Sequence, residues 1–289
     1  MNRIKTIFAL LAALSVVPMM SRAQFANGDT INPCHIKVSC STYGSGIIDC
    51  KDTYLSDEFY WGSGILYYGH ENFRNARTGT YMWKYRTDFS GTLGTARFKD
   101  SNQHILMLNR TWSGYHTFRR SDNCRLLAGP IIELLGGAIY MPSNSNNPVS
   151  AKLSTSLGVS GMLIVGRAMS NGDAVLRLQL DASLVGAAFS PEYGESYYEI
   201  FGLGNYDNII KLTHPGNAMS WRGTIAMDIP LGKKRKNTLR ISYVLDRYQT
   251  ELNGLHTKFG RSVLSLGFVK TLYKIKGKSP LKSYNPYSY

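Results

Sequence analysis

The segment from Asp173 to Phe189 alternates apolar and polar side chains over 17 residues. Successive side chains of a β-strand point to opposite faces of the sheet. One face of this segment would carry Ala174, Leu176, Leu178, Leu180, Ala182 and Leu184, and the other Arg177, Gln179, Asp181 and Ser183. Strands of globular proteins are usually roughly 5–6 residues long, whereas a tilted strand crosses a bilayer with roughly 9–11 residues. The pattern therefore predicts a membrane-crossing strand.

The same alternation recurs along most of the chain. In a late segment, for example, Ile241 and Tyr243 share one face and Arg240 and Ser242 share the other. Alternation together with turn-forming residues between the segments predicts ten strands. Their approximate bounds are 36–50, 56–73, 79–98, 104–118, 124–141, 150–167, 173–189, 217–231, 238–251 and 258–273.

The connections between these strands alternate in kind. Residues 74–78, 119–123, 168–172 and 232–237 form compact turns, whereas 142–149 and 190–216 are longer. Bacterial membrane barrels have short periplasmic turns and longer extracellular loops. Assigning the compact turns to the periplasm also places both chain ends there, because ten is an even number of strands.

A soluble barrel whose apolar face points inward would show the same periodicity. The charged residues in the middle of the strands separate the two interpretations. Burying Arg177, Asp181 and Arg222 in a dry core would be costly, whereas a membrane barrel places them in a polar lumen. We therefore predict an all-β protein, an antiparallel up-and-down transmembrane β-barrel of about ten strands.

The first 23 residues have the three parts of a secretory signal. Arg3 and Lys5 supply the positive start, residues 7–20 the apolar run, and 21–23 a small-x-small cleavage site that ends at Ala23. We expect four regions: the signal at 1–23, a periplasmic segment at 24–35, the barrel at 36–273 and a basic periplasmic tail at 274–289. Such a protein would reside in the outer membrane of the cell.

The composition agrees with this prediction and bears on partners. Aromatic residues make up 12% of the chain, with 19 tyrosines and 28 glycines, which suits a barrel with aromatic girdles. The formal charge is +14, but much of it lies outside the strands, at 233–236 and in the tail. No recognition-helix pattern accompanies it, so we expect no nucleic-acid partner. We expect a monomer surrounded by outer-membrane lipid.

An early segment resembles a known family. It reads Thr42-Tyr43-Gly44, then Asp52-Thr53-Tyr54-Leu55-Ser56, and glycine- and aromatic-rich strands follow to the end of the chain. It is similar to a Gram-negative family catalogued as domain of unknown function 3316 (DUF3316). The family pattern usually has a proline after this serine, where Asp57 stands here. The resemblance implies a signal peptide and an outer-membrane barrel, and it brings no activity or catalytic residue.

The polar faces of the strands define a predicted lumen. Barrels of roughly eight strands are filled by their own side chains, and aqueous channels appear at 16–18 strands. We expect the charged side chains to pair and to occlude the lumen. A narrow anion-favouring channel for small solutes is the alternative, because seven of the twelve residues are basic. The twelve are Lys84, Arg86, Asp88, Arg125, Glu133, Lys152, Arg177, Asp181, Arg222, Asp228, Arg240 and Asp246.

The long connection 190–216 is the best candidate for a specific function, because binding residues concentrate on loops held by a rigid scaffold. Its aromatic residues suit stacking on sugars, peptides or a partner protein; the alternative is that they pack on one another or lie in the outer interfacial belt. The candidates for binding an extracellular ligand are Tyr193, Tyr197, Tyr198, Phe201 and Tyr206. We therefore expect surface binding, adhesion or structural support.

An outer-membrane hydrolase of the omptin type is the enzymatic alternative. The acids and histidines available near the loops are Asp207, His214, Asp52, Asp57, Glu58 and His256. Their spacing matches no omptin motif, and no Gly-x-Ser-x-Gly elbow occurs, so we predict no enzyme and no catalytic residue.

The sequence shows no metal-ligand spacing, and we expect no cofactor. Cys40 and Cys50 would lie on one strand, roughly 33 Å apart at the usual rise, which is too far for a disulfide. A bridge from Cys34 to Cys124 is conceivable but is not expected.

Overall fold

A computed structural model describes residues 35–75, 80–92, 96–98, 101–121, 123–145, 147–166, 174–231 and 237–274. The expected signal peptide, the segment 24–34 and the tail 275–289 lie outside the described residues. Within the described part, no helix is long and apolar enough to cross a membrane.

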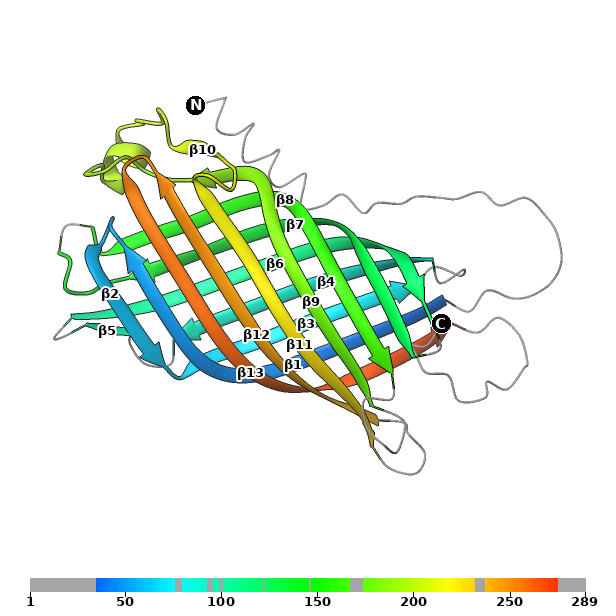
Figure 1. Cartoon of the computed structure of the whole chain (residues 1–289). Helices are drawn as coiled ribbons and strands as arrows, with labels where there is room; N and C mark the ends of the chain where they lie inside the picture. Colours follow the sequence, from blue (N-terminus) through cyan, green and yellow to red (C-terminus); the bar gives the residue numbers. More distant parts are fainter. Residues whose placement is uncertain are drawn as a thin grey trace. The chain divides into compact units, whose positions relative to one another are not determined.

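The described chain is almost entirely β-structure (Figure 1). The elements are β1 (His35–Asp52), β2 (Ser56–Ser63), β3 (Ile65–Asn75), β4 (Tyr81–Thr92), β5 (Ala96–Phe98), β6 (Ser101–Arg120), β7 (Cys124–Tyr140), β8 (Val149–Gly166), β9 (Val175–Phe189), the short π-helical turn η1 (Tyr198–Gly202), β10 (Ile210–Thr213), β11 (Ala218–Leu231), β12 (Asn237–Leu252) and β13 (Leu255–Lys274).

Antiparallel pairing runs around the sheet in the order β13-β12-β11-β9-β8-β7-β6-β4-β3-β1. The last strand also pairs with the first, from His35 opposite Lys274 to Asp52 opposite Thr257, so the sheet closes into a barrel. The prediction of a ten-stranded transmembrane barrel is confirmed. The expected strand 56–73 is divided into β2 and β3, and the expected strand 79–98 into β4 and β5.

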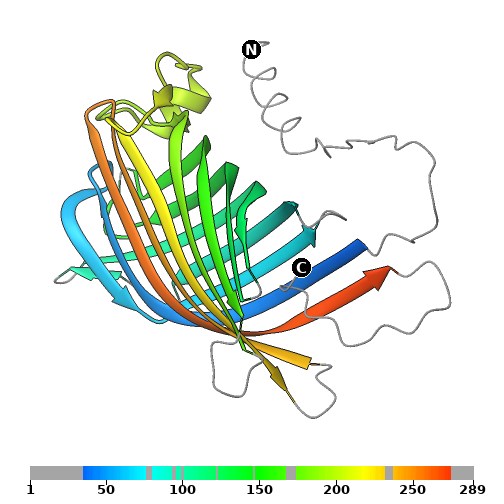
Figure 2. The same ribbon diagram turned by 45° about the vertical axis from the view of Figure 1, so that its right-hand side comes forward.

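We call the end where β1 begins and β13 ends the terminal end, and the opposite end the loop end. The strand ends that flank the four connections predicted to be compact all lie at the terminal end. The turn 253–254 between β12 and β13, the connection 141–148 and the long connection 190–217 lie at the loop end (Figures 1 and 2). Short turns therefore occur at both ends, because Thr53–Leu55 and Asn253–Gly254 are compact as well.

The alternation of the sequence places apolar side chains on the outside of the barrel. Leu106, Leu180, Ile225, Leu264 and Phe268 are all exposed. A folded protein in water does not usually expose so continuous an apolar surface, and this surface is what a bilayer covers. One contact on it involves Trp83, whose ring lies against Gly114 on the neighbouring strand.

The inside of the barrel is packed. One apolar cluster lies toward the loop end and includes Ile48, Tyr60, Ile65, Met107 and Phe259. A second lies toward the terminal end and includes Val38, Phe73, Met82, Leu127 and Val269. On β4, the charged side chains follow Met82 toward the loop end. Apolar layers and a charged layer thus share the lumen.

Candidate functional site

The charged layer contains a first cluster around Glu71. Its carboxylate contacts Lys84 at 2.9 Å, Arg177 at 2.7 Å and Arg240 at 2.7 Å. Arg240 also forms a bidentate ion pair with Asp228, with N–O distances of 2.6 and 2.7 Å. These residues come from β3, β4, β9, β11 and β12, so the cluster ties opposite walls of the barrel together. All five side chains are buried.

The same cations surround an aromatic ring. Phe73 has Arg177 at 4.9 Å, Lys84 at 5.5 Å and Arg240 at 5.9 Å from the centre of its ring. A cation within about 6 Å of a ring is attracted to the face of that ring. The ring therefore supports three cations that share one carboxylate.

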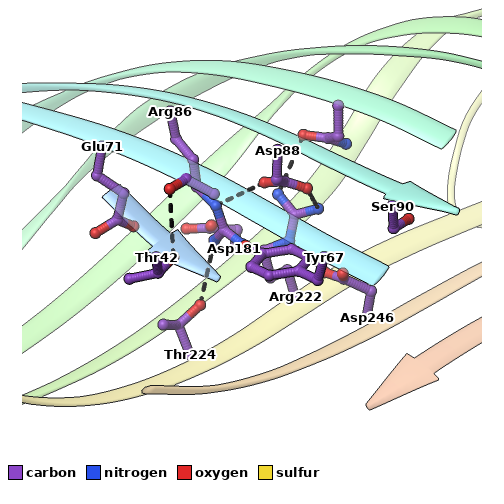
Figure 3. Close-up of polar contacts among 12 residues, drawn as sticks. Thr42, Tyr67, Glu71, Arg86, Asp88, Ser90, Asp181, Arg222, Thr224 and Asp246 are labelled. Atoms are coloured by element: carbon purple, nitrogen blue, oxygen red, sulfur yellow. Dashed lines mark hydrogen bonds and ion pairs between the residues drawn. The ribbon is translucent and has the colours of Figure 1, made fainter. Parts of the chain in front are cut away.

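A second cluster is built on Asp88 and Asp246 (Figure 3). Asp88 contacts Arg86 at 2.7 Å, Arg222 at 3.2 Å and Arg261 at 2.5 Å. Asp246 contacts Arg222 and Arg261 as well. Two carboxylates and three guanidinium groups thus form one network, which also receives support from the Tyr67 hydroxyl, 3.1 Å from Arg86.

Nearer the loop end, Asp52 contacts Lys152 at 2.9 Å, and both also bond Thr257, at 3.3 and 3.0 Å. Arg125, nearer the terminal end, donates to Thr117 at 2.8 and 3.0 Å.

Two interior acids differ from the rest, because their hydrogen-bond partners are neutral. Asp181 accepts from Ser160 and Gln179. Glu133 accepts from Asn109 at 2.5 Å, Ser183 at 3.1 Å and Ser220 at 3.4 Å.

All twelve residues predicted for the lumen lie on inward-facing positions; ten are buried, and Glu133 and Lys152 are half-buried. Three further interior charges were not predicted for the lumen: Asp52, which the sequence analysis placed near the loops, Glu71 and Arg261. With them, the described part of the interior holds eight basic and seven acidic residues instead of seven and five. The basic excess that favoured an anion channel is thereby reduced from two charges to one.

A β-hairpin motif in the sequence could have placed Arg261 in the lumen. Asn-Gly between two alternating segments is the strongest short-range indication of a two-residue turn, and Asn253-Gly254 is such a pair. The turn fixes the register in which Asp246 stands opposite Arg261. Glu71 and Asp52 gave no comparable signal, because glycine and a turn interrupt the alternation near them.

Two small cavities of about 30 Å³ each meet at Glu133. The first extends into the second charged cluster and is lined by Asn109, Arg222, Asp246 and Arg261. The other extends toward the loop end and is lined by Ser156, Ser183, Ser220, Tyr248 and His214.

The long connection 190–217 is held onto the barrel by hydrogen bonds. The Tyr54 hydroxyl donates to the Glu195 carbonyl at 2.9 Å. The Asn253 amide donates to the carbonyls of Ser190 at 2.8 Å and Asn208 at 3.0 Å. These contacts come from turns at the loop end, so the connection is anchored at several points.

The aromatic residues of this connection divide into two groups. Tyr197 is half-buried, and its ring forms a cluster with the rings of Phe189 and Phe201, whose centres are 6.1–6.3 Å apart. Its hydroxyl accepts a hydrogen bond from the Ala151 amide at 2.6 Å. Tyr193 and Tyr198, in contrast, are 75% and 71% exposed, and Phe201 is 56% exposed. Tyr206 is half-buried. Packing thus occupies Tyr197, whereas the exposed rings remain available for contact.

Burial raises the pKa of the Tyr54 hydroxyl, and the neighbouring Tyr197 adds to the shift. Burial also raises the pKa of the Tyr197 hydroxyl, although the Ala151 amide opposes it. On the exposed side, the backbone amide and hydroxyl of Ser196 hold the pKa of Glu199 below its usual range.

The acids and histidines weighed as catalytic candidates are not brought together. Asp52 points into the barrel toward Lys152. His214 accepts a hydrogen bond from the Gly216 amide, and His256 lies 3.9 Å from Glu251. Asp57 pairs with Lys51 at the surface, and Asp207 and Glu58 are exposed.

Within the described residues, no group of three or more His, Cys, Asp or Glu side chains could hold a metal ion. Cys40 and Cys50 lie buried on β1 and unbridged, as expected, and Cys124 is also free. Cys34 lies outside the described residues.

The chain has structural likenesses among solved proteins. The outer membrane protease OmpT from Escherichia coli has 7% identity and a TM-score of 0.49, over 85% of this chain and 99% of that one. The translocator domain of the autotransporter NalP from Neisseria meningitidis has 11% identity and a TM-score of 0.41, over 92% and 97% of the two chains. These scores are too low to support a shared activity.

A comparison with curated proteins finds no match. A family model described as "Protein of unknown function (DUF3316)" matches residues 7–279, which agrees with the resemblance seen around residues 42–56. The chain belongs to the DUF3316 family.

Proposed function

We propose that this protein is an outer-membrane barrel with a closed lumen that binds a ligand at the cell surface through the connection 190–217. The apolar exterior supports the membrane location, since only a closed barrel or a helix satisfies its backbone in lipid. The longer connections 141–148 and 190–217 lie at the loop end, which supports an orientation in which the terminal end faces the periplasm.

The observation that carries the proposal is the contrast between the lumen and the loop. In the lumen, ion pairs join opposite walls, which supports a closed lumen without a route for a solute. The loop, in contrast, is anchored by Tyr54 and Asn253 and still exposes Tyr193, Tyr198 and part of Phe201. Rigid, exposed aromatic rings are suited to stacking on a sugar or a peptide at low entropic cost.

The test is retention of the purified, refolded barrel on beads that carry mucin or mannan. A variant with Tyr193→Ser, Tyr198→Ser and Phe201→Ser should lose retention, because it removes the exposed rings and leaves the anchors. Phe118→Ser is the matched control, since Phe118 is similarly exposed but lies at the terminal end. Equal retention of the triple variant and the wild type would refute a role for these rings.

A further inference from the structure

The wall of the barrel is interrupted beside β9. The pairing of β11 with β9 ends at Trp221 opposite Ala182. The pairing of β10 with β9 begins at Thr213 opposite Gly186. Between these points, three residues of β9, 183–185, stand opposite seven residues, 214–220. The register of β9 with β8 also shifts here, so that Leu184 is an extra residue on β9.

The second of the two cavities lies at this interruption. Its lining includes Leu184, Val185 and Met219, whose side chains are each about half exposed on the outside of the barrel. The same lining includes Glu133 and Ser156, which belong to the inside. Because residues of both faces of the wall line this cavity, we interpret it as an opening between the membrane-facing surface and the interior.

Glu133 is the charged group that this opening reaches. Its three hydrogen-bond partners are the neutral groups of Asn109, Ser183 and Ser220. Within the described part of the chain, no Lys or Arg lies at ion-pair distance from Glu133, whereas Asp52, Glu71, Asp88, Asp228 and Asp246 each have one. A half-buried carboxylate with only neutral partners favours a cationic hydrogen-bond donor.

The size of the opening and the residues around it limit the size and polarity of the ligand. Each cavity of about 30 Å³ exceeds the roughly 10–15 Å³ that one water molecule needs, so it has room for a small polar group such as an ammonium. The serines and Tyr248 around Glu133 can hold the remaining polar groups. On the outside of the barrel, the apolar side chains of Leu184, Val185 and Met219 lie next to the opening.

We propose that this opening is a lateral binding site for the ammonium headgroup of a single-chain amphiphile. The ammonium group donates hydrogen bonds to Glu133 and its neighbouring serines, and the alkyl chain lies along Leu184, Val185 and Met219. The site differs from the exposed rings of the connection 190–217 and does not depend on them.

Dodecylammonium is the probe, and Trp221 is the reporter because it lines the first cavity beside the interruption. The other tryptophans are replaced by W61F, W83F and W112F, and the barrel is refolded into phosphatidylcholine vesicles, whose trimethylammonium groups lack N–H donors. Dodecylammonium should change Trp221 fluorescence saturably, and dodecanol and dodecyl sulfate should not. Methylammonium carries the charged group without the alkyl chain. If methylammonium saturated the fluorescence change at the same concentration as dodecylammonium, the proposal that binding requires an alkyl chain would be overturned.

Glu133→Gln should weaken dodecylammonium binding about tenfold or more, since a charge-assisted hydrogen bond is lost. Glu251→Gln is the control, because Glu251 is an exposed acid at the loop end and its loss should leave binding unchanged. If Glu133→Gln does not refold, a Ser183→Val/Ser220→Val variant, which keeps the carboxylate, should also weaken binding. Equal binding by a folded variant at Glu133 or at both serines, or no preference for the ammonium over the alcohol, would overturn the proposal.

Discussion

Asp88 is shared by three guanidinium groups in the middle of the lumen. Replacing it with asparagine keeps the size of the side chain and removes the anion, so Arg86, Arg222 and Arg261 lose a common partner. Loss of one partner of a buried ion pair costs about 3–5 kcal/mol. We expect Asp88→Asn to lower the free energy of unfolding by that amount, measured by urea titration of the refolded barrel in vesicles.

The control for this measurement is Asp49→Asn. Asp49 contacts Arg247 at 3.4 Å on the outside of β1, where both side chains are partly exposed. Exposed pairs contribute about 0–1 kcal/mol. If Asp88→Asn costs no more than Asp49→Asn, the central network does not stabilise the barrel.

Tyr54 is a second residue with a measurable signature. Burial raises the pKa of its hydroxyl in the folded state, above the ordinary value of about 10. A hydroxyl whose pKa is higher in the folded than in the unfolded protein stabilises the fold fully at any pH below its pKa in the unfolded protein. This contribution is lost as the pH rises through its pKa in the folded protein. Stability should therefore fall with rising pH above about pH 10.

The ultraviolet absorbance of phenolate, compared between the wild type and Tyr54→Phe, isolates this ionisation. We expect the difference to appear well above pH 10. A difference that appears at the ordinary tyrosine value would mean that the connection 190–217 does not cover Tyr54.

At the scale of elements, the turn between β12 and β13 depends on backbone conformation. Asn253 and Gly254 both have positive φ, at 52° and 70°, which an Asn-Gly pair adopts readily. We expect Gly254→Ala to lower the free energy of unfolding by about 1 kcal/mol, measured by the same urea titration. Gly161→Ala should be nearly neutral, because Gly161 has open space where a Cβ would stand and no positive φ is found there. Equal effects at the two positions would show that the turn is not strained.

The elements also show how far the sequence could predict the structure. Alternation identified ten strands because each strand has one face toward lipid and one toward the lumen, and this requirement acts on every residue. It also indicated the inward direction of side chains such as Arg222 and Asp246. The interruption of the wall at 183–185 was not predictable, because it depends on which residues of β9 pair with β11 and which pair with β10. The burial of Tyr197 was equally hidden, since its partners Tyr54 and Ala151 are distant in sequence.

At the scale of the whole molecule, the filled lumen predicts that the barrel does not conduct ions. We expect the refolded wild-type barrel to show no steady conductance in a planar bilayer. Arg222→Ala/Arg240→Ala removes two of the eight basic residues in the described interior and leaves its seven acids, so any openings of this variant should favour cations. An Arg74→Ala/Arg110→Ala variant, which removes two outward-facing residues, should remain silent. Steady anion-selective current through the wild type would contradict the closed lumen.

The pairing of the first strand with the last also has a consequence for how the protein is assembled. Arg240 and Glu71 are 169 residues apart in the sequence, and Arg261 and Asp88 are 173 apart. Contacts between such distant residues form late and slowly, because a long loop must close first. Until β13 meets β1, an unsealed sheet would present these charges to water and delay burial in lipid. The charges would then keep the incomplete chain soluble during its transit, and their pairing would coincide with the sealing of the barrel.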